Sequence, residues 1–146
     1  MDMNAHFAAI LMVCFAFPSG LACAQNPKVT CDQKTAMEAE KEALASSVKN
    51  WDGLYQSFRR FSQCDDGSVG EGYSDTVEHL LAEDWQHFDR LVSLTSTDRQ
   101  FQRFVLKHID ELWSPEHARA VSRNASQHCP PKGKRLCDLI IKRIAE

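Results

Sequence analysis

The sequence has neither a large excess of charge of one sign nor a concentrated basic patch. Its formal net charge is −3 over 146 residues, and lysine and arginine are scattered along the chain. Binding to nucleic acid needs a basic stripe or patch that neutralises phosphates, so the sequence excludes this class of partner. It gives no basis for binding to an anionic membrane surface either. The ordinary apolar and charged fractions, 43% and 25%, indicate one folded domain rather than a disordered chain.

The first apolar run of the sequence is too short to cross a bilayer. This run, Phe7–Phe17, has the length of a signal-peptide core, and helix-breaking proline and glycine follow it. Ala22-Cys23-Ala24 then forms a small-x-small cleavage pattern. We therefore predict that residues 1–24 are a signal peptide and that residues 25–146 are a single exported domain, with no membrane attachment after cleavage.

Two features of the N-terminal segment leave other kinds of processing open. Met1–His6 contains no lysine or arginine, although signal peptides usually begin with positive charge. Leu21-Ala22-Cys23 resembles a lipoprotein box, but Gly20 lies where a larger aliphatic residue is expected. A lipid anchor on Cys23 and a retained segment are thus alternatives to simple cleavage.

The mature chain has no CxxC pair, and no HxxxH-type cluster accompanies its cysteines. Cleavage would remove Cys14 and Cys23, two of the six cysteines. An even number in an exported chain indicates two disulfides rather than a metal site. The cysteines that remain are Cys31, Cys64, Cys129 and Cys137.

Alternation typical of strands is absent, whereas helical periodicity recurs from residue 25 onward. Amphipathic stretches with start signals such as Ser114-Pro115-Glu116 predict six helices with short connections, and thus a compact antiparallel all-α bundle. A glycine-bearing loop is predicted over Asp65–Tyr73. The six predicted helices span approximately Asp32–Ser46, Asn50–Ser62, Ser74–Leu94, Thr97–Leu112, Ser114–Cys129 and Lys134–Ile144. Capping boxes are predicted at Thr35-x-x-Glu38, Asp75-x-x-Glu78 and Thr97-x-x-Gln100.

The order of these helices limits how the cysteines can pair. Cys129 ends the fifth predicted helix and Cys137 lies in the first turn of the sixth, so these two can bridge that corner. Cys31 and Cys64 lie at the same end of the first two helices if these form a hairpin. One continuous helix would instead separate them by roughly 45 Å, far beyond disulfide reach. The serine pair and Gly53 between the two apolar stretches favour the hairpin.

The sequence contains no catalytic or cofactor signature. Serine occurs in no GxSxG-type turn, and Gly67–Gly72 has neither a preceding strand nor a lysine for a phosphate site. His79, Glu83 and His87 recur every four residues, but helical projection places them on the solvated face. Three ligands along one straight helix also spread too far for a compact metal site. We therefore predict that the protein has no metal and no cofactor and is not an enzyme.

Two further groups of polar residues can be explained without a metal site or catalysis. Asp65, Asp66 and Glu71 do not match the ligand spacing of an EF-hand calcium loop. His108 adjoins the apolar face of its helix and precedes Asp110, and we interpret it as a half-buried histidine whose hydrogen bonds are satisfied.

The run Cys64–Asp75, CDDGSVGEGYSD, resembles the central segment of type VI secretion amidase immunity proteins. Phe101–Asp110 and the terminal Cys129–Cys137 segment are similar to that family as well, and the resemblance extends from about Trp51 to the end. It implies a periplasmic, helical, homodimeric protein that binds a secreted peptidoglycan amidase. In that family a protruding loop plugs the enzyme's active-site groove.

Two segments have the composition expected for such a plug. Asp65–Tyr73 combines acids, glycines and one aromatic residue, and the turn around Asp110–His117 adds a stiffening proline, which lowers the entropy cost of binding. Carboxylates suit an enzyme groove of complementary charge, and tryptophan and tyrosine are frequent binding hot spots. The predicted partner-binding residues are Asp65, Asp66, Glu71, Tyr73, Asp110, Glu111, Trp113 and Glu116.

Two other functions are compatible with the sequence. One is an exported helical module that binds a different ligand, such as a small apolar molecule, although the many large aromatic residues indicate a filled core. The other is a small secreted enzyme that uses His108 with Asp110, or the His79–Glu83–His87 row.

Overall fold

Helices form all the regular structure in residues 30–109 and 113–146, the ranges that the computed structural model describes. The all-α fold class predicted from the sequence is therefore confirmed, with seven α-helices in these ranges rather than six and short 3-10 turns between several of them. The α-helices are α1 (Gln33–Ala43), α2 (Trp51–Phe61), α3 (Gly67–Ala82), α4 (Phe88–Thr97), α5 (Arg99–Lys107), α6 (Pro115–Gln127) and α7 (Lys134–Ile144).

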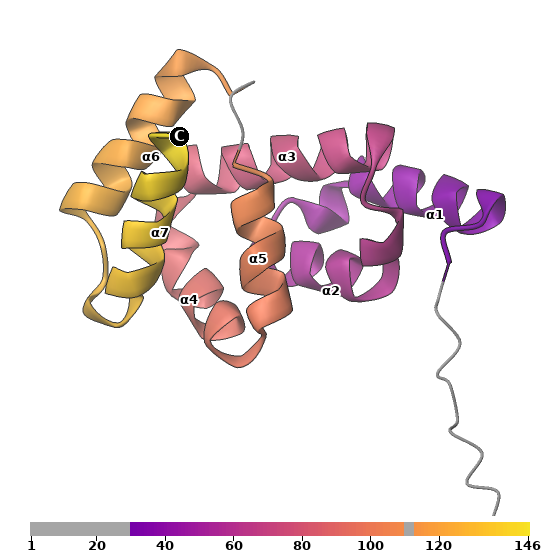
Figure 1. The fold of residues 1–146 in the computed structure, drawn as a ribbon, viewed down its shortest axis with the longest axis horizontal. Coiled ribbons are helices and arrows are strands. Elements are labelled where there is room, and N and C mark those ends of the chain that lie inside the picture. Colours follow the sequence, from indigo (N-terminus) through magenta and orange to yellow (C-terminus); the bar gives the residue numbers. More distant parts are fainter. Residues whose placement is uncertain (1–29, 110–112) are drawn as a thin grey trace, which may run out of the picture.

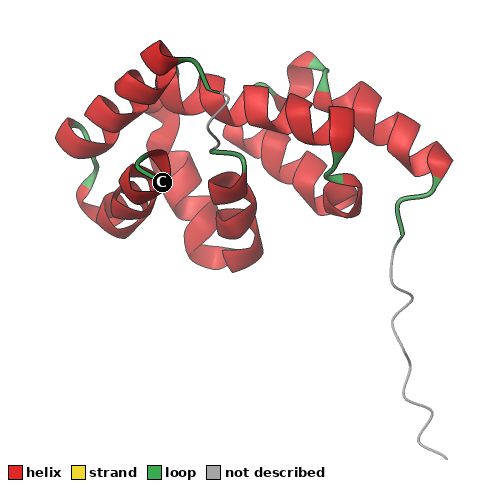
Figure 2. Cartoon of the chain, turned by 45° about the horizontal axis from the view of Figure 1, so that its top comes forward, coloured by secondary structure: helices red, strands yellow, loops and turns green. Residues whose placement is uncertain are grey.

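The longest helix, α3, links the two ends of the molecule (Figure 1). The α1–α2 hairpin packs near its first turns, and α6 and α7 lie at its other end, with α4 and α5 between the two groups. The connecting loops are short (Figure 2). No helix in the described part of the chain is both long and apolar enough to cross a membrane.

The core contains the apolar stripes that the periodicity predicts. Trp51, Leu54, Phe58 and Phe61 of α2 are all buried. The Phe58 ring lies against Phe104 of α5, with 4.9 Å between ring centroids. Burying one such side chain contributes about 1.5–3 kcal/mol to stability.

Both disulfides are present with the expected pairing. Cys31 bonds to Cys64 with 5.0 Å between their Cα atoms, and Cys129 bonds to Cys137 with a Cα separation of 6.3 Å. The first bridge closes the α1–α2 hairpin, so the alternative of one continuous helix is wrong. The second bridge joins the end of α6 to the first turn of α7.

The prediction of a loop over Asp65–Tyr73 is wrong, because α3 already begins at Gly67. Asp66 caps this helix by accepting a hydrogen bond from the Gly67 N–H at 2.9 Å. Tertiary packing explains why glycine is present here: a Cβ at Gly72 would lie 3.1 Å from the Cβ of Ala43 in α1. The glycines therefore allow α1 and α3 to approach closely, rather than making this segment a loop.

The single predicted helix over Ser74–Leu94 is also wrong. α3 ends at Ala82, a 3-10 turn spans Trp85–His87, and α4 begins at Phe88. The break lets Trp85 stack on Phe88 at 4.0 Å and donate its indole N–H to the His128 carbonyl at the end of α6. The spacing of these apolar residues also fits one continuous helix, so periodicity does not reveal the break.

None of the three predicted capping boxes is the cap of its helix. Asp98 caps α5 by accepting from the Gln100 and Phe101 N–H groups, so this helix begins two residues after Thr97. Asp75 and Glu78 lie inside α3, and Asp32 rather than Thr35 caps α1. The predicted start of α6 is confirmed, because Ser114 Oγ accepts from the His117 N–H at 3.1 Å.

Candidate partner-binding site

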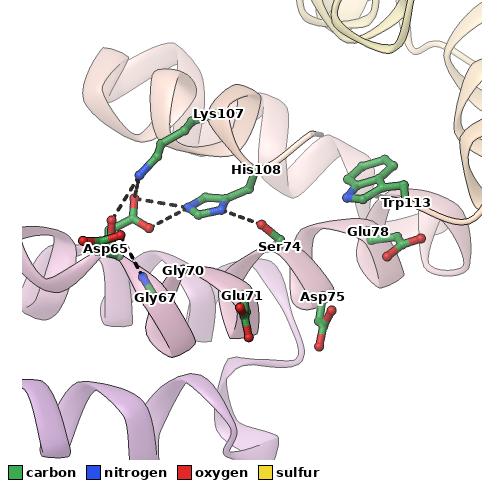
Figure 3. A pocket seen from close by; sticks show the side chains of 11 residues that line it. Asp65, Gly67, Gly70, Glu71, Ser74, Asp75, Glu78, Lys107, His108 and Trp113 are labelled. Atoms are coloured by element: carbon green, nitrogen blue, oxygen red, sulfur yellow. Dashed lines mark hydrogen bonds and ion pairs between the residues drawn. The ribbon is translucent and has the colours of Figure 1, made fainter. Parts of the chain in front are cut away.

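A pocket of about 400 Å³ lies between the first half of α3 and the end of α5 (Figure 3). Residues that are far apart in the chain provide its walls: residues of the segment Asp65–Glu78 on one side, and Lys107, His108 and Trp113 on the other. The lining residues are Asp65, Asp66, Gly67, Gly70, Glu71, Ser74, Asp75, Glu78, Lys107, His108 and Trp113.

The wall formed by α3 follows from helical spacing. Gly67, Glu71, Ser74 and Glu78 recur every three or four residues and so share one face of the helix. The face extends to Gly67 because α3 begins there, and the periodicity from Ser74 onward does not reveal it.

A line of hydrogen bonds fixes the inner wall of the pocket (Figure 3). His108 Nε2 donates to Asp65 Oδ2 at 3.2 Å, because a carboxylate only accepts, and His108 Nδ1 accepts from Ser74 Oγ at 2.9 Å. Lys107 Nζ donates to Asp65 Oδ2 at 2.9 Å and to the Asp65 carbonyl at 3.1 Å. The His108 and Asp65 side chains are only 4% and 9% exposed. The interpretation of His108 as a histidine with satisfied hydrogen bonds is confirmed, although it is buried rather than half-buried.

Asp65 carries the charge in this network. Burial raises the pKa of its carboxyl, but hydrogen bonds from His108 and Lys107 outweigh burial and hold that pKa below its ordinary value. The ionised form is therefore bound more tightly in the folded state than in the unfolded chain. The ionised Asp65 carboxyl contributes its full stabilisation above the pKa of about 3.9 that it has in the unfolded chain. This stabilisation is lost as the pH falls through the lower pKa that the carboxyl has in the folded protein.

We expect Asp65→Asn to reduce the acid sensitivity of the fold. Between about pH 5 and pH 3 the free energy of unfolding should fall more steeply as the pH is lowered in the wild-type protein than in the variant. The reason is that only the wild-type protein takes up a proton at this carboxyl when it unfolds in this pH range. Denaturant titrations at several pH values measure both slopes. Parallel slopes would contradict the assignment of Asp65 as the buried anion of the network.

Carboxylates dominate the rest of the pocket. Asp66, Glu71 and Asp75 are exposed, and Glu71 and Asp75 lie four residues apart on α3, where like charges repel. Glu78 is held in place, because its Oε1 accepts from the Ser114 N–H and lies 3.0 Å from His117 Nδ1. The pocket thus presents several negative charges, with Lys107 already bound to Asp65.

Trp113 closes one end of the pocket. Its side chain is 7% exposed, and its indole N–H is buried with no hydrogen-bond partner among the described residues. Figure 3 shows the nitrogen on the side of the ring that faces Ser74 and His108. An unsatisfied buried donor is costly, so an acceptor that reached this group would stabilise it.

Ser74, His108 and Asp65 have the residue types and the order of a hydrolase triad. Catalysis of that kind also needs donors aimed at a developing oxyanion. Ser74 lies within α3, and Glu71 and Asp75, which also line the pocket, would repel such a charge. We therefore interpret the line as a support that holds Asp65 in place.

The structure brings together half of the predicted partner-binding residues. Asp65, Asp66, Glu71 and Trp113 all line the pocket. Glu116 is exposed in the first turn of α6 but does not line it.

The remaining predicted residues have other placements. The prediction for Tyr73 is wrong, because its side chain is fully buried, shares a 2.9 Å hydrogen bond with Ser57 and packs on Phe104. Asp110 and Glu111 lie outside the described residues.

The histidines of the predicted solvated row have carboxylate partners. His79 lies 3.4 Å from Glu83, and His87 lies 2.7 Å from Asp84. No group of three or more potential ligands in the described ranges is placed to hold a metal ion.

Comparison with known proteins provides no relative for this site. No protein-family model, curated protein or solved structure matches the chain. The similarity to amidase immunity proteins therefore stays a prediction, carried by the residues quoted above.

Proposed function

We propose that this chain is a periplasmic immunity protein that binds a type VI secreted cell-wall amidase and blocks its active-site groove. The observation that carries this proposal is the acidic pocket itself. Two of the segments that resemble the immunity family, Cys64–Asp75 and Phe101–Asp110, are distant in sequence, yet residues from both line the pocket. Their meeting at one surface is expected if both serve the same binding function.

The chemistry of this surface suits a protein partner. Electrostatic complementarity sets both the specificity and the rate of association, and the pocket supplies several carboxylates at a fixed position on α3. Trp113 adds an aromatic residue of the type most frequent at hot spots. A preformed surface of this kind loses little entropy on binding.

The other parts of the proposal concern location and the plugging segment. Two disulfides are typical of oxidising compartments such as the periplasm and agree with the predicted signal peptide. Because α3 begins at Gly67, the connection from α5 to α6 is the better candidate for the plug, with Asp110 and Glu111 as its predicted acids. Ser114 and Pro115 fix where this connection ends.

A homodimer is part of the same proposal. The large apolar side chains of Met37 and Leu44 are each 66% exposed, and a second copy would cover such groups. Light scattering of the oxidised protein should give twice the mass of one chain.

Co-purification tests the proposed function directly. The oxidised protein is mixed with a panel of cell-wall amidases that includes the one encoded beside it, and bound enzyme is assayed for hydrolysis of peptidoglycan. We expect one-to-one capture per protomer and loss of hydrolysis. Absence of capture across the panel would contradict the immunity function.

A second candidate function is hydrolysis by the protein itself. The line of Ser74, His108 and Asp65 favours it, despite the surrounding carboxylates. Hydrolysis of peptide or ester substrates by the purified protein, abolished by Ser74→Ala, would support an enzyme.

A further inference from the structure

We propose that the pocket between α3 and α5 receives a lysine or arginine side chain of the bound protein, whose adjacent main-chain carbonyl accepts a hydrogen bond from Trp113 Nε1. This inference rests on the proposed function, since it names the chemistry by which the partner is recognised. Charge, buried unsatisfied groups and the fixed geometry of the pocket each support it.

The charge of the pocket requires a cation. Glu71 and Asp75 are exposed and repel each other on α3, and Asp66 caps the start of the same helix. Such a like-charged pair weakens a helix and has no compensating cation among the lining residues, because Lys107 is bound to Asp65. A positively charged side chain placed between them would remove the repulsion and form charge-assisted hydrogen bonds.

Two buried atoms at the pocket have unsatisfied hydrogen-bonding capacity. Among the described residues the Trp113 indole N–H has no acceptor, and Asp65 Oδ1 has no hydrogen-bond donor of its own. His108 Nε2 lies 3.1 Å from this oxygen and 3.2 Å from Oδ2, so one N–H is shared between the two oxygens and Oδ1 can still accept a further hydrogen bond. A ligand that serves both the carboxylates and the Trp113 indole must carry a donor and an acceptor.

The need for both a hydrogen-bond donor and an acceptor favours a lysine or arginine residue of a peptide over other cations. A metal ion would be repelled by the indole N–H, and the described residues hold no group of three ligands placed for a metal. A simple polyamine carries donors but no acceptor for Trp113. A lysine or arginine residue in a peptide has both, because its main-chain carbonyl lies within a few bonds of the charged side chain.

The unsatisfied indole of Trp51 serves as an internal comparison. Its Nε1 is also buried without a partner, but Trp51 lies in the core and lines no part of this pocket. Only the Trp113 indole should therefore respond to a ligand in the pocket.

Nuclear magnetic resonance of the oxidised protein tests the pocket without any amidase. The probes are the blocked tripeptides acetyl-Gly-Lys-Gly-amide and acetyl-Gly-Gln-Gly-amide, and the readout is the indole N–H resonance of Trp113, assigned with Trp113→Phe. We expect a saturable shift with the lysine peptide and at least tenfold weaker binding of the glutamine peptide. The Trp51 resonance should not move.

A double variant and a matched control locate the binding charge. Glu71→Gln with Asp75→Asn should weaken binding of the lysine peptide about tenfold. Asp138→Asn, an exposed carboxylate on α7 outside the pocket, should leave binding unchanged. Equal shifts with both peptides, or equal binding by the double variant and the wild type, would overturn the inference.

The two proposals can fail separately. If no amidase is captured but the lysine peptide shifts Trp113, the pocket binds peptide cations and the immunity function is wrong. If an amidase is captured and inhibited but the lysine peptide has no effect, the immunity function holds and the pocket inference is wrong.

Discussion

Loss of the Cys31–Cys64 disulfide is expected to lower the free energy of unfolding by about 4 kcal/mol. The bridge spans 33 residues, and a loop of that length greatly restricts the unfolded chain. It also anchors the turn before α3, so its loss weakens the support of Asp65. The change is made as Cys31→Ala with Cys64→Ala, because Cys64 is buried and a serine hydroxyl there would lack partners.

The second disulfide provides the control for this prediction. Cys129 and Cys137 are only eight residues apart, so the same double replacement by alanine should cost about 2.5 kcal/mol. Denaturant titrations of both double variants measure the two losses under identical conditions. A larger loss at Cys129–Cys137 would show that restriction of the unfolded chain does not determine these contributions.

Replacing Gly53 with alanine is expected to destabilise the protein by about 3 kcal/mol. Gly53 lies in the first turn of α2, where the helix approaches the backbone just before it. An added Cβ would overlap the Ser47 carbonyl oxygen and lie 2.8 Å from its carbonyl carbon and 3.1 Å from Val48 Cα. Backbone atoms cannot rotate away as a flexible side chain can, so the α1–α2 hairpin must shift.

Gly70 is the matched control, because it also lies within a helix. A Cβ there would meet only Asp65, at 3.4 Å from Oδ1 and 3.9 Å from the carbonyl carbon, which is ordinary contact. Alanine favours helix over glycine, so Gly70→Ala should raise stability by about 0.5–1 kcal/mol. Thermal unfolding compares the two variants, and destabilisation of equal size in both would contradict the close approach at Gly53.

The sequence by itself determined the fold class and most helix positions, and it favoured a disulfide pairing that only the structure established. Apolar residues recur at helical spacing through α2 and α5, and this pattern alone requires amphipathic helices. The pairing was favoured because cysteines at the ends of short helices have few partners within reach, provided that α1 and α2 form a hairpin. These features depend on local chemistry and on chain length.

Only the tertiary structure decided where α3 begins, where it ends and what its first half does. The glycines before Tyr73 predicted a loop, whereas the segment is helical and Gly72 packs closely on Ala43 of α1. The break after Ala82 exists because Trp85 bonds to His128. Ser74 and His108 are 34 residues apart, and no local pattern shows that they meet. The acidic pocket arises from such long-range contacts, which only packing of the whole chain determines.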